Sequence, residues 1–152
     1  MNATGEVDVY QADVTRWLKE IETGDLRGTL LHGIATKAAK QFEVLLRAFL
    51  QRYMDNADID YQRDVRSKIK GKKNEGLDAL TLGQTIKALD YVNSVATKTL
   101  VDAEAWHILE RILESRNSLQ HEPRDQRELV ILAQTLLGDI EKIMERGVFR
   151  IV

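Results

Sequence analysis

The feature that most constrains the fold is a long stretch of apolar residues spaced by three and four, from about Leu26 to Met54. Its stripe consists of Leu31, Ala35, Ala38, Phe42, Leu45, Phe49 and Tyr53. This spacing places the side chains on one face of an α-helix. About 28 residues at ~1.5 Å per residue give a helix of about 42 Å. The sequence therefore predicts a long central helix.

Further helices are predicted on both sides of this segment. A short amphipathic helix is expected at 13–22, with Val14, Trp17, Leu18 and Ile21 on one face, and one or two helical turns at 61–69. Thr81 begins another helix, because Gln84 three residues later completes a capping box. The apolar residues expected to face inward from it are Leu82, Ile86, Leu89 and Val92.

Two helices complete the predicted bundle. The first is capped by Thr99 or Asp102 and carries an apolar stripe of Ala105, Leu109, Ile112 and Leu113. The second begins at Asp125 with Glu128 as its cap pair, and Gly147 suits its C-terminal end. Its apolar face consists of Leu129, Leu132, Ala133, Leu136, Leu137, Ile140, Ile143 and Met144. The pattern predicts an all-α bundle of about five to six helices.

Composition agrees with a single domain spanning residues 1–152, with 43% hydrophobic and 30% charged residues, one proline and no cysteine. Absence of cysteine fits a reducing cytoplasm. The N-terminal ten residues lack the apolar core of a signal peptide, and no apolar run approaches the ~18 residues of a membrane span. We therefore expect a cytoplasmic protein that does not enter membranes. Because the net charge is −2, RNA binding would require a local basic patch.

The strongest candidate site is the stretch from Ser115 to Pro123, which contains the only proline. Arg116 follows Ile112 by four residues and therefore continues the apolar stripe, where an arginine needs a partner. Asn117 and His121 lie four apart on one helical face. Pro123 disfavours helical geometry at the preceding residue, so the helix should end near His121. A structural interpretation is also open, in which Arg116 pairs with Glu110 or Glu114 and His121 caps carbonyl groups.

The pattern Arg116-Asn117-x-x-x-His121 resembles the motif of HEPN domains, an arginine and a histidine four to six residues apart. Two other segments look similar to members of that family: 42–47, with Glu43 and Arg47 one helical turn apart, and 80–86, which opens a helix. The similarity covers roughly 26–144. It implies a HEPN-like bundle that often forms homodimers, with Arg116, Asn117 and His121 as the site.

The resemblance also implies a function. HEPN nucleases cleave RNA without a metal or other cofactor, by attack of the ribose 2′-OH on the adjacent phosphate. Histidine can exchange the protons near neutral pH, and arginine can stabilise charge on the phosphate. We therefore expect a metal-independent endoribonuclease, a toxin or defence effector with an antitoxin or regulatory protein partner. The alternative is a catalytically inactive HEPN-like module for dimerisation or protein binding. Some HEPN domains carry a modified tyrosine two residues after the histidine, where this chain has Pro123.

A basic cluster offers a second contact with RNA. It consists of Arg63, Arg66, Lys68, Lys70, Lys72 and Lys73. Phosphate groups could bind there, with Tyr53 and Tyr61 stacking on bases. The alternatives are a solvated lysine loop and two tyrosines at the edge of the core.

Metal binding is not predicted. Di-iron helical bundles use two Glu-x-x-His motifs and two further glutamates. Glu104-x-x-His107 is one such motif, and the sequence contains no second one. His32 has no obvious partner in the sequence, so we expect it on a helix surface or at an interface.

Overall fold

The computed structural model describes residues 3–69, 76–96, 101–121, 125–147 and 149. Over these ranges the chain is helical and contains no β-strand. The α-helices are α1 (Ala3–Thr23), α2 (Gly28–Asn56), α3 (Leu82–Val95), α4 (Ala103–Gln120) and α5 (Gln126–Glu145). Short helical turns occupy Tyr61–Val65, Arg66–Lys68 and Leu77–Ala79. The predicted all-α class and the turns at 61–69 are confirmed.

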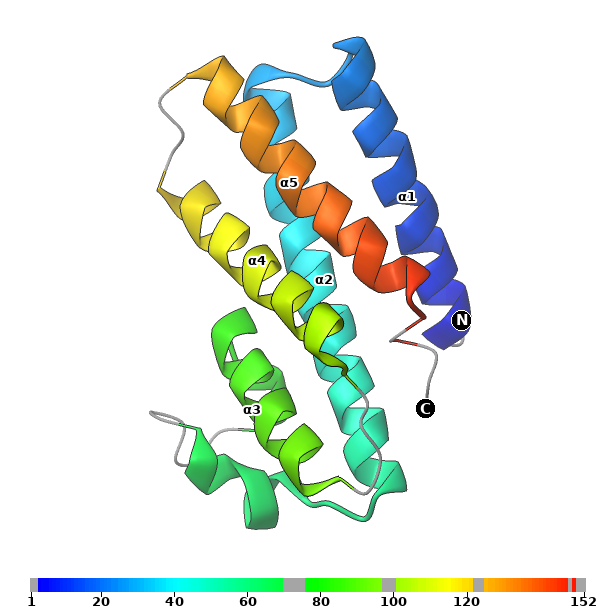
Figure 1. Ribbon diagram of the computed structural model, residues 1–152, viewed down its shortest axis with the longest axis vertical. Coiled ribbons are helices and arrows are strands. Elements are labelled where there is room, and N and C mark those ends of the chain that lie inside the picture. Colours follow the sequence, from blue (N-terminus) through cyan, green and yellow to red (C-terminus); the bar gives the residue numbers. More distant parts are fainter. Residues whose placement is uncertain (1–2, 70–75, 97–100, 122–124, 148, 150–152) are drawn as a thin grey trace.

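Helix α2 is the centre of the bundle, as predicted, and contacts α1, α3, α4 and α5 (Figure 1). The stripe is buried from Leu31 to Phe42 and again at Phe49, whereas Leu45 and Tyr53 are only partly buried. Over its second half the buried face also takes in Leu46, Leu50 and Met54. Leu46, Leu50 and Met54 recur every four residues, and because an α-helix has about 3.6 residues per turn, the buried face rotates along the second half of α2.

Helix α1 begins ten residues earlier than the predicted Asp13. Val7 and Tyr10 continue the buried line of Val14, Trp17 and Ile21 toward the N-terminus. Polar residues between them concealed this spacing in the sequence. The Tyr10 hydroxyl donates a hydrogen bond to the carbonyl of Ala38 on α2, and burial raises the pKa of Tyr10. The first helix is therefore held against the central one.

The starts of α3, α4 and α5 follow the capping residues that the sequence contains. Thr81 and Gln84 form a reciprocal capping box at the start of α3. Asp102 accepts from the backbone N–H of Ala105 at the start of α4, while the other predicted cap, Thr99, lies outside the described residues. Asp125 accepts from the backbone N–H of Glu128 at the start of α5. Local side-chain acceptors thus set these boundaries.

Beyond α5, Phe149 returns the chain to the core. Its ring makes edge-on contacts with Phe42 and Phe49 of α2, with centroid distances of 5.7 and 5.9 Å. The Arg52 guanidinium donates to the Phe149 carbonyl at 3.2 Å. Gly147 makes the preceding turn with φ of +72°, a left-handed conformation that glycine adopts readily. These contacts of Phe149 hold the segment that follows α5 against α2.

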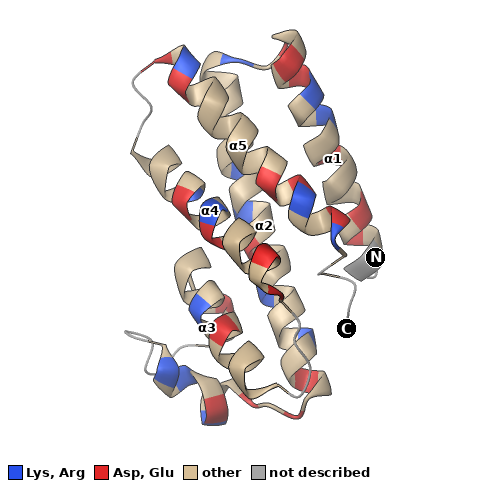
Figure 2. Ribbon diagram, in the orientation of Figure 1, with Lys and Arg blue, Asp and Glu red and all other residues tan. Residues whose placement is uncertain are grey.

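Charged residues cover the outside of the bundle. Acidic and basic positions are interspersed over the face drawn in Figure 2. In the described ranges, no helix combines the length and apolar character required to cross a membrane.

Candidate functional site

The candidate motif occupies the end of α4, as predicted. The helix ends at Gln120 and His121 is its exposed C-cap, with a backbone N–H that donates to the Ser118 carbonyl at 3.2 Å. The prediction that Arg116 continues the buried stripe is wrong. Ser115 and Leu119 follow Ile112 on the buried face, and Arg116 lies half-buried beside them. The guanidinium is therefore at the edge of the core.

Arg116 takes a neutral partner. Its Nη1 donates to Oδ1 of the adjacent Asn117 at 3.1 Å. The structural alternative, a pair with Glu110 or Glu114, does not form among the described residues, and Glu110 instead lies 3.7 Å from His107. Within the part of the chain that the structure describes, no carboxylate therefore pairs with Arg116, and Asn117 orients its guanidinium.

Arg116 faces a pocket of about 420 Å³ between α2 and α4. The lining residues are His32, Thr36, Ala39, Lys40, Glu43, Arg116, Leu119 and Gln120. Asn117 and His121, the other predicted site residues, are exposed nearby and do not line it. Pockets of ~300–1,000 Å³ are typical of small-molecule sites, and this pocket falls within that range.

His32 has a partner that its sequence neighbours did not reveal. Its Nε2 lies 3.2 Å from the carbonyl oxygen of Leu119 on α4. The last carbonyls of a helix have no partner within it, so the ring caps α4 from the neighbouring helix. A carbonyl only accepts, so Nε2 carries the hydrogen and Nδ1 of the neutral ring keeps its lone pair. The sequence shows no obvious partner for His32; the structure provides one at the contact between α2 and α4, which agrees with the expected interface position.

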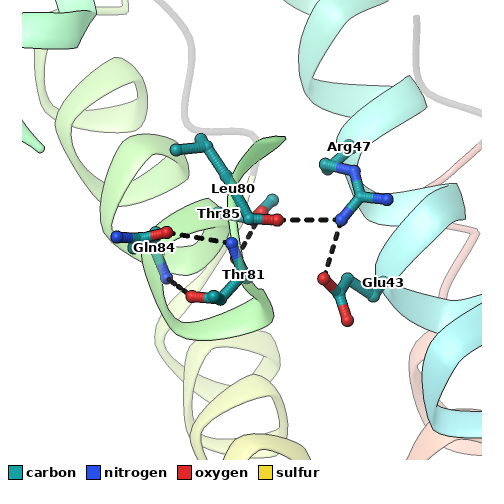
Figure 3. A network of polar contacts seen from close by, with 6 residues as sticks. All are labelled: Glu43, Arg47, Leu80, Thr81, Gln84 and Thr85. Carbon is teal, nitrogen blue, oxygen red and sulfur yellow. Dashed lines mark hydrogen bonds and ion pairs between the residues drawn. The ribbon is translucent and has the colours of Figure 1, made fainter. Parts of the chain in front are cut away.

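The carboxylate in the pocket wall is already paired. Arg47 Nη1 donates to Glu43 Oε1 at 2.7 Å and to the Leu80 carbonyl at 2.9 Å (Figure 3). Leu80 directly precedes the Thr81–Gln84 capping box, so this network joins α2 to the start of α3. The two segments that resemble HEPN members, 42–47 and 80–86, therefore meet in space.

The predicted basic cluster is only partly described. Arg63 is bound to Asp64 through Nε at 2.9 Å and Nη2 at 2.7 Å, and Arg66 is half-buried. Lys68 lies 5.5 Å from the centroid of the Tyr91 ring. The remaining predicted members, Lys70, Lys72 and Lys73, lie outside the described residues. Because Asp64 pairs with Arg63, the Arg63 guanidinium is less available to a phosphate than the sequence suggested.

The structure also gives the positions of the Glu104-x-x-His107 motif and of the two tyrosines that the sequence places near the basic cluster. Tyr61 is buried and Tyr53 partly buried, which suits residues at the edge of the core. Glu104 pairs with Arg146 at 3.2 Å. Within the described residues, no three histidine or acidic side chains converge as metal ligands would.

Comparisons with protein-family models, with curated protein sequences and with solved structures give no match for this chain.

Sequence reasoning gave no site role to His32 and Lys40, which line the pocket with Arg116. The signal that could have found them is spacing on the central helix. His32, Thr36, Lys40 and Glu43 recur at intervals of four, four and three, which places them on one face. That face lies next to the buried stripe and points toward α4 in the folded chain.

Proposed function

We propose that this protein is an endoribonuclease of the HEPN type, acting as a toxin or defence effector. The observation that supports the proposal best is Arg116. It is half-buried, lacks a carboxylate partner among the described residues, and faces a pocket that also contains Lys40. Two cations at one pocket suit a phosphate group. An exposed histidine, His121, lies five residues further along the chain, at the end of the same helix.

In the proposed reaction, a histidine removes the proton from a ribose 2′-OH, and the oxygen attacks the adjacent phosphorus. The bond from phosphorus to the 5′ oxygen breaks, and a protonated group gives that oxygen a proton. The products are a 2′,3′-cyclic phosphate and a 5′-hydroxyl. Arg116, held by Asn117, stabilises the charge on the phosphate oxygens, and His121 exchanges a proton.

A homodimer is part of this proposal. In HEPN nucleases two copies of the motif commonly face each other, and the exposed position of His121 at a helix end leaves it accessible to a second chain. An antitoxin or regulatory protein would then control the paired site.

The test is cleavage of unmodified RNA by purified protein and by Arg116→Ala and His121→Ala variants. Each variant should lower the rate by at least about 10²-fold, the usual scale for loss of an acid–base group or a charge-stabilising donor. Cleavage should continue in excess EDTA, yield cyclic phosphate ends and leave DNA intact. The matched control is His107→Ala, because His107 is exposed on the same helix at a distance of fourteen positions from His121. An unchanged rate in the two site variants would contradict the assignment.

The second candidate is the inactive interaction module. The observation that favours it is a groove between α1 and α2, lined by the exposed apolar side chains Val9 and Val44. Apolar side chains gathered on a surface are typical of protein contact sites. A wild-type protein that cleaves no RNA, but whose association is lost in Val44→Glu, would favour this function.

A further inference from the structure

The pocket between α2 and α4 contains two groups to which the motif gives no role. His32 and Lys40 both come from the central helix and reach the pocket that Arg116 faces from α4. We propose that Lys40 and His32 bind the phosphodiester backbone of single-stranded RNA in this pocket, together with Arg116. The inference rests on the proposed function for its choice of ligand, and its test measures binding without cleavage.

The charge balance of the pocket favours an anion. Glu43 is the carboxylate in the lining, and its charge is taken up by Arg47 at 2.7 Å. Within the described residues, neither Lys40 nor Arg116 forms an ion pair. Two cations without an ion pair among the described residues therefore line one pocket of a protein whose net charge is −2, although Lys40 also borders the groove that contains Glu6 and Asp13. A phosphate is the ligand that would neutralise them at close range.

His32 is oriented to add a directional contact. The Leu119 carbonyl holds Nε2 as a donor, which fixes the ring and leaves Nδ1 as the second functional nitrogen. Neutral Nδ1 can accept a hydrogen bond from a ribose hydroxyl, and protonated Nδ1 can donate one to a phosphate oxygen. The ring also lies close to the motif, because Leu119 and His121 are two residues apart, a Cα separation of at most about 7.6 Å.

Spacing along α2 fits a nucleic-acid backbone rather than a small ion. His32 and Lys40 are eight residues apart, which is ~12 Å along a helix. Lysine has a long flexible stem, so Lys40 can reach either toward Arg116 or toward a neighbouring phosphate. One ribose and its flanking phosphates would therefore contact both ends of the pocket.

The experiment measures binding of a single-stranded, 2′-O-methylated RNA of mixed sequence by fluorescence anisotropy. Methylation removes the 2′-OH, so the probe cannot be cleaved by the proposed reaction. Lys40→Gln should weaken binding about tenfold, because a hydrogen bond to a charged group contributes ~1.5–3 kcal/mol and ~1.4 kcal/mol is tenfold. The slope of log K against log salt should also fall by about 0.7, the value for one phosphate contact on a single strand.

His32→Gln should weaken binding by about threefold or more, the effect of one hydrogen bond. Glutamine keeps an N–H that can donate to the Leu119 carbonyl, so a purely structural role would be rescued. The imidazole proton resonances of His32 should shift when the RNA is added, whereas those of His107 should not. The sequence has only three histidines, so these resonances can be assigned by substitution.

The matched controls are Lys37→Gln and His107→Gln, both at exposed positions outside the pocket lining. Thermal unfolding of every variant separates lost contacts from lost folding. No binding by the wild-type protein, or pocket variants that match the controls in affinity and salt slope, would overturn the inference. Pocket variants that bind RNA as the controls do, while Arg116→Ala and His121→Ala lose cleavage, would leave the nuclease proposal intact and remove this one. Pocket-dependent binding without any cleavage would support the inference and contradict the nuclease proposal.

Discussion

Replacing Arg47 tests the link between the central helix and the segment that opens α3. Arg47→Met keeps most of the side-chain length but removes the guanidinium. In the folded protein this group donates to Glu43 Oε1 at 2.7 Å and to the Leu80 carbonyl at 2.9 Å (Figure 3). The substitution therefore removes two bonds with one change and leaves two acceptors without their donor.

The expected loss follows from burial of the pair. The Arg47 and Glu43 side chains are 19% and 15% exposed, so water replaces the lost partner only in part. Hydrogen bonds involving a charged group contribute ~1.5–3 kcal/mol each. Allowing for the remaining solvent, we expect the free energy of unfolding to fall by about 3 kcal/mol. For a domain of this size each kcal/mol corresponds to ~2–4 °C, so the melting temperature should fall by about 6–12 °C.

The assay is urea unfolding followed by circular dichroism, with Arg127→Met as control because Arg127 is exposed on α5. A cycle with Glu43→Gln isolates the ion pair, and its coupling energy should exceed about 1 kcal/mol. A loss below about 0.5 kcal/mol for Arg47→Met, the range of ordinary surface substitutions, would refute the reasoning.

Three further results are expected. Phe149→Ala should lower the free energy of unfolding by about 3 kcal/mol in urea unfolding, because it empties a site packed against Phe42 and Phe49. The hydrogen bond from Arg63 lowers the pKa of Asp64 from 3.8 to about 2. The Asp64 carboxylate therefore contributes stability above pH 3.8, and this contribution is lost as the pH falls toward about 2. Asp64→Asn should reduce the pH dependence of the free energy of unfolding over that interval, measured by acid unfolding. Light scattering at micromolar concentration should give twice the 17.4 kDa of one chain, and a monomer would contradict the proposed dimer.

The sequence predicted the helices well because their signals are local. Thr81, Asp102 and Asp125 each accept a bond from a backbone N–H three residues later, and those partners are visible in the chain itself. The start of α1 was missed for the opposite reason. Val7 and Tyr10 are buried by contacts with other parts of the fold, and their surroundings in the sequence are polar.

The site was harder to predict because its members come from helices far apart in the chain. Arg116 and His121 form a recognisable local pattern, whereas His32 reaches Leu119 across 87 positions. Spacing on a helix can show that His32, Lys40 and Glu43 share a face. It cannot show which neighbouring helix covers that face, because packing of the whole bundle decides this.

Helix α2 serves both the core and the pocket, and the two tasks constrain each other. Its buried stripe fixes its rotation against α1 and α5. That rotation places His32 beside α4, and it places Lys40 where it borders both the pocket at α4 and the groove at α1. Glu43 contributes to both tasks, because it lines the pocket and also accepts from Arg47 in the link to α3. As long as that pair is intact, the carboxylate is directed to Arg47, and the charges of Lys40 and Arg116 remain available to a ligand. Stability of the α2–α3 link and the positive character of the proposed RNA pocket therefore depend on the same ion pair.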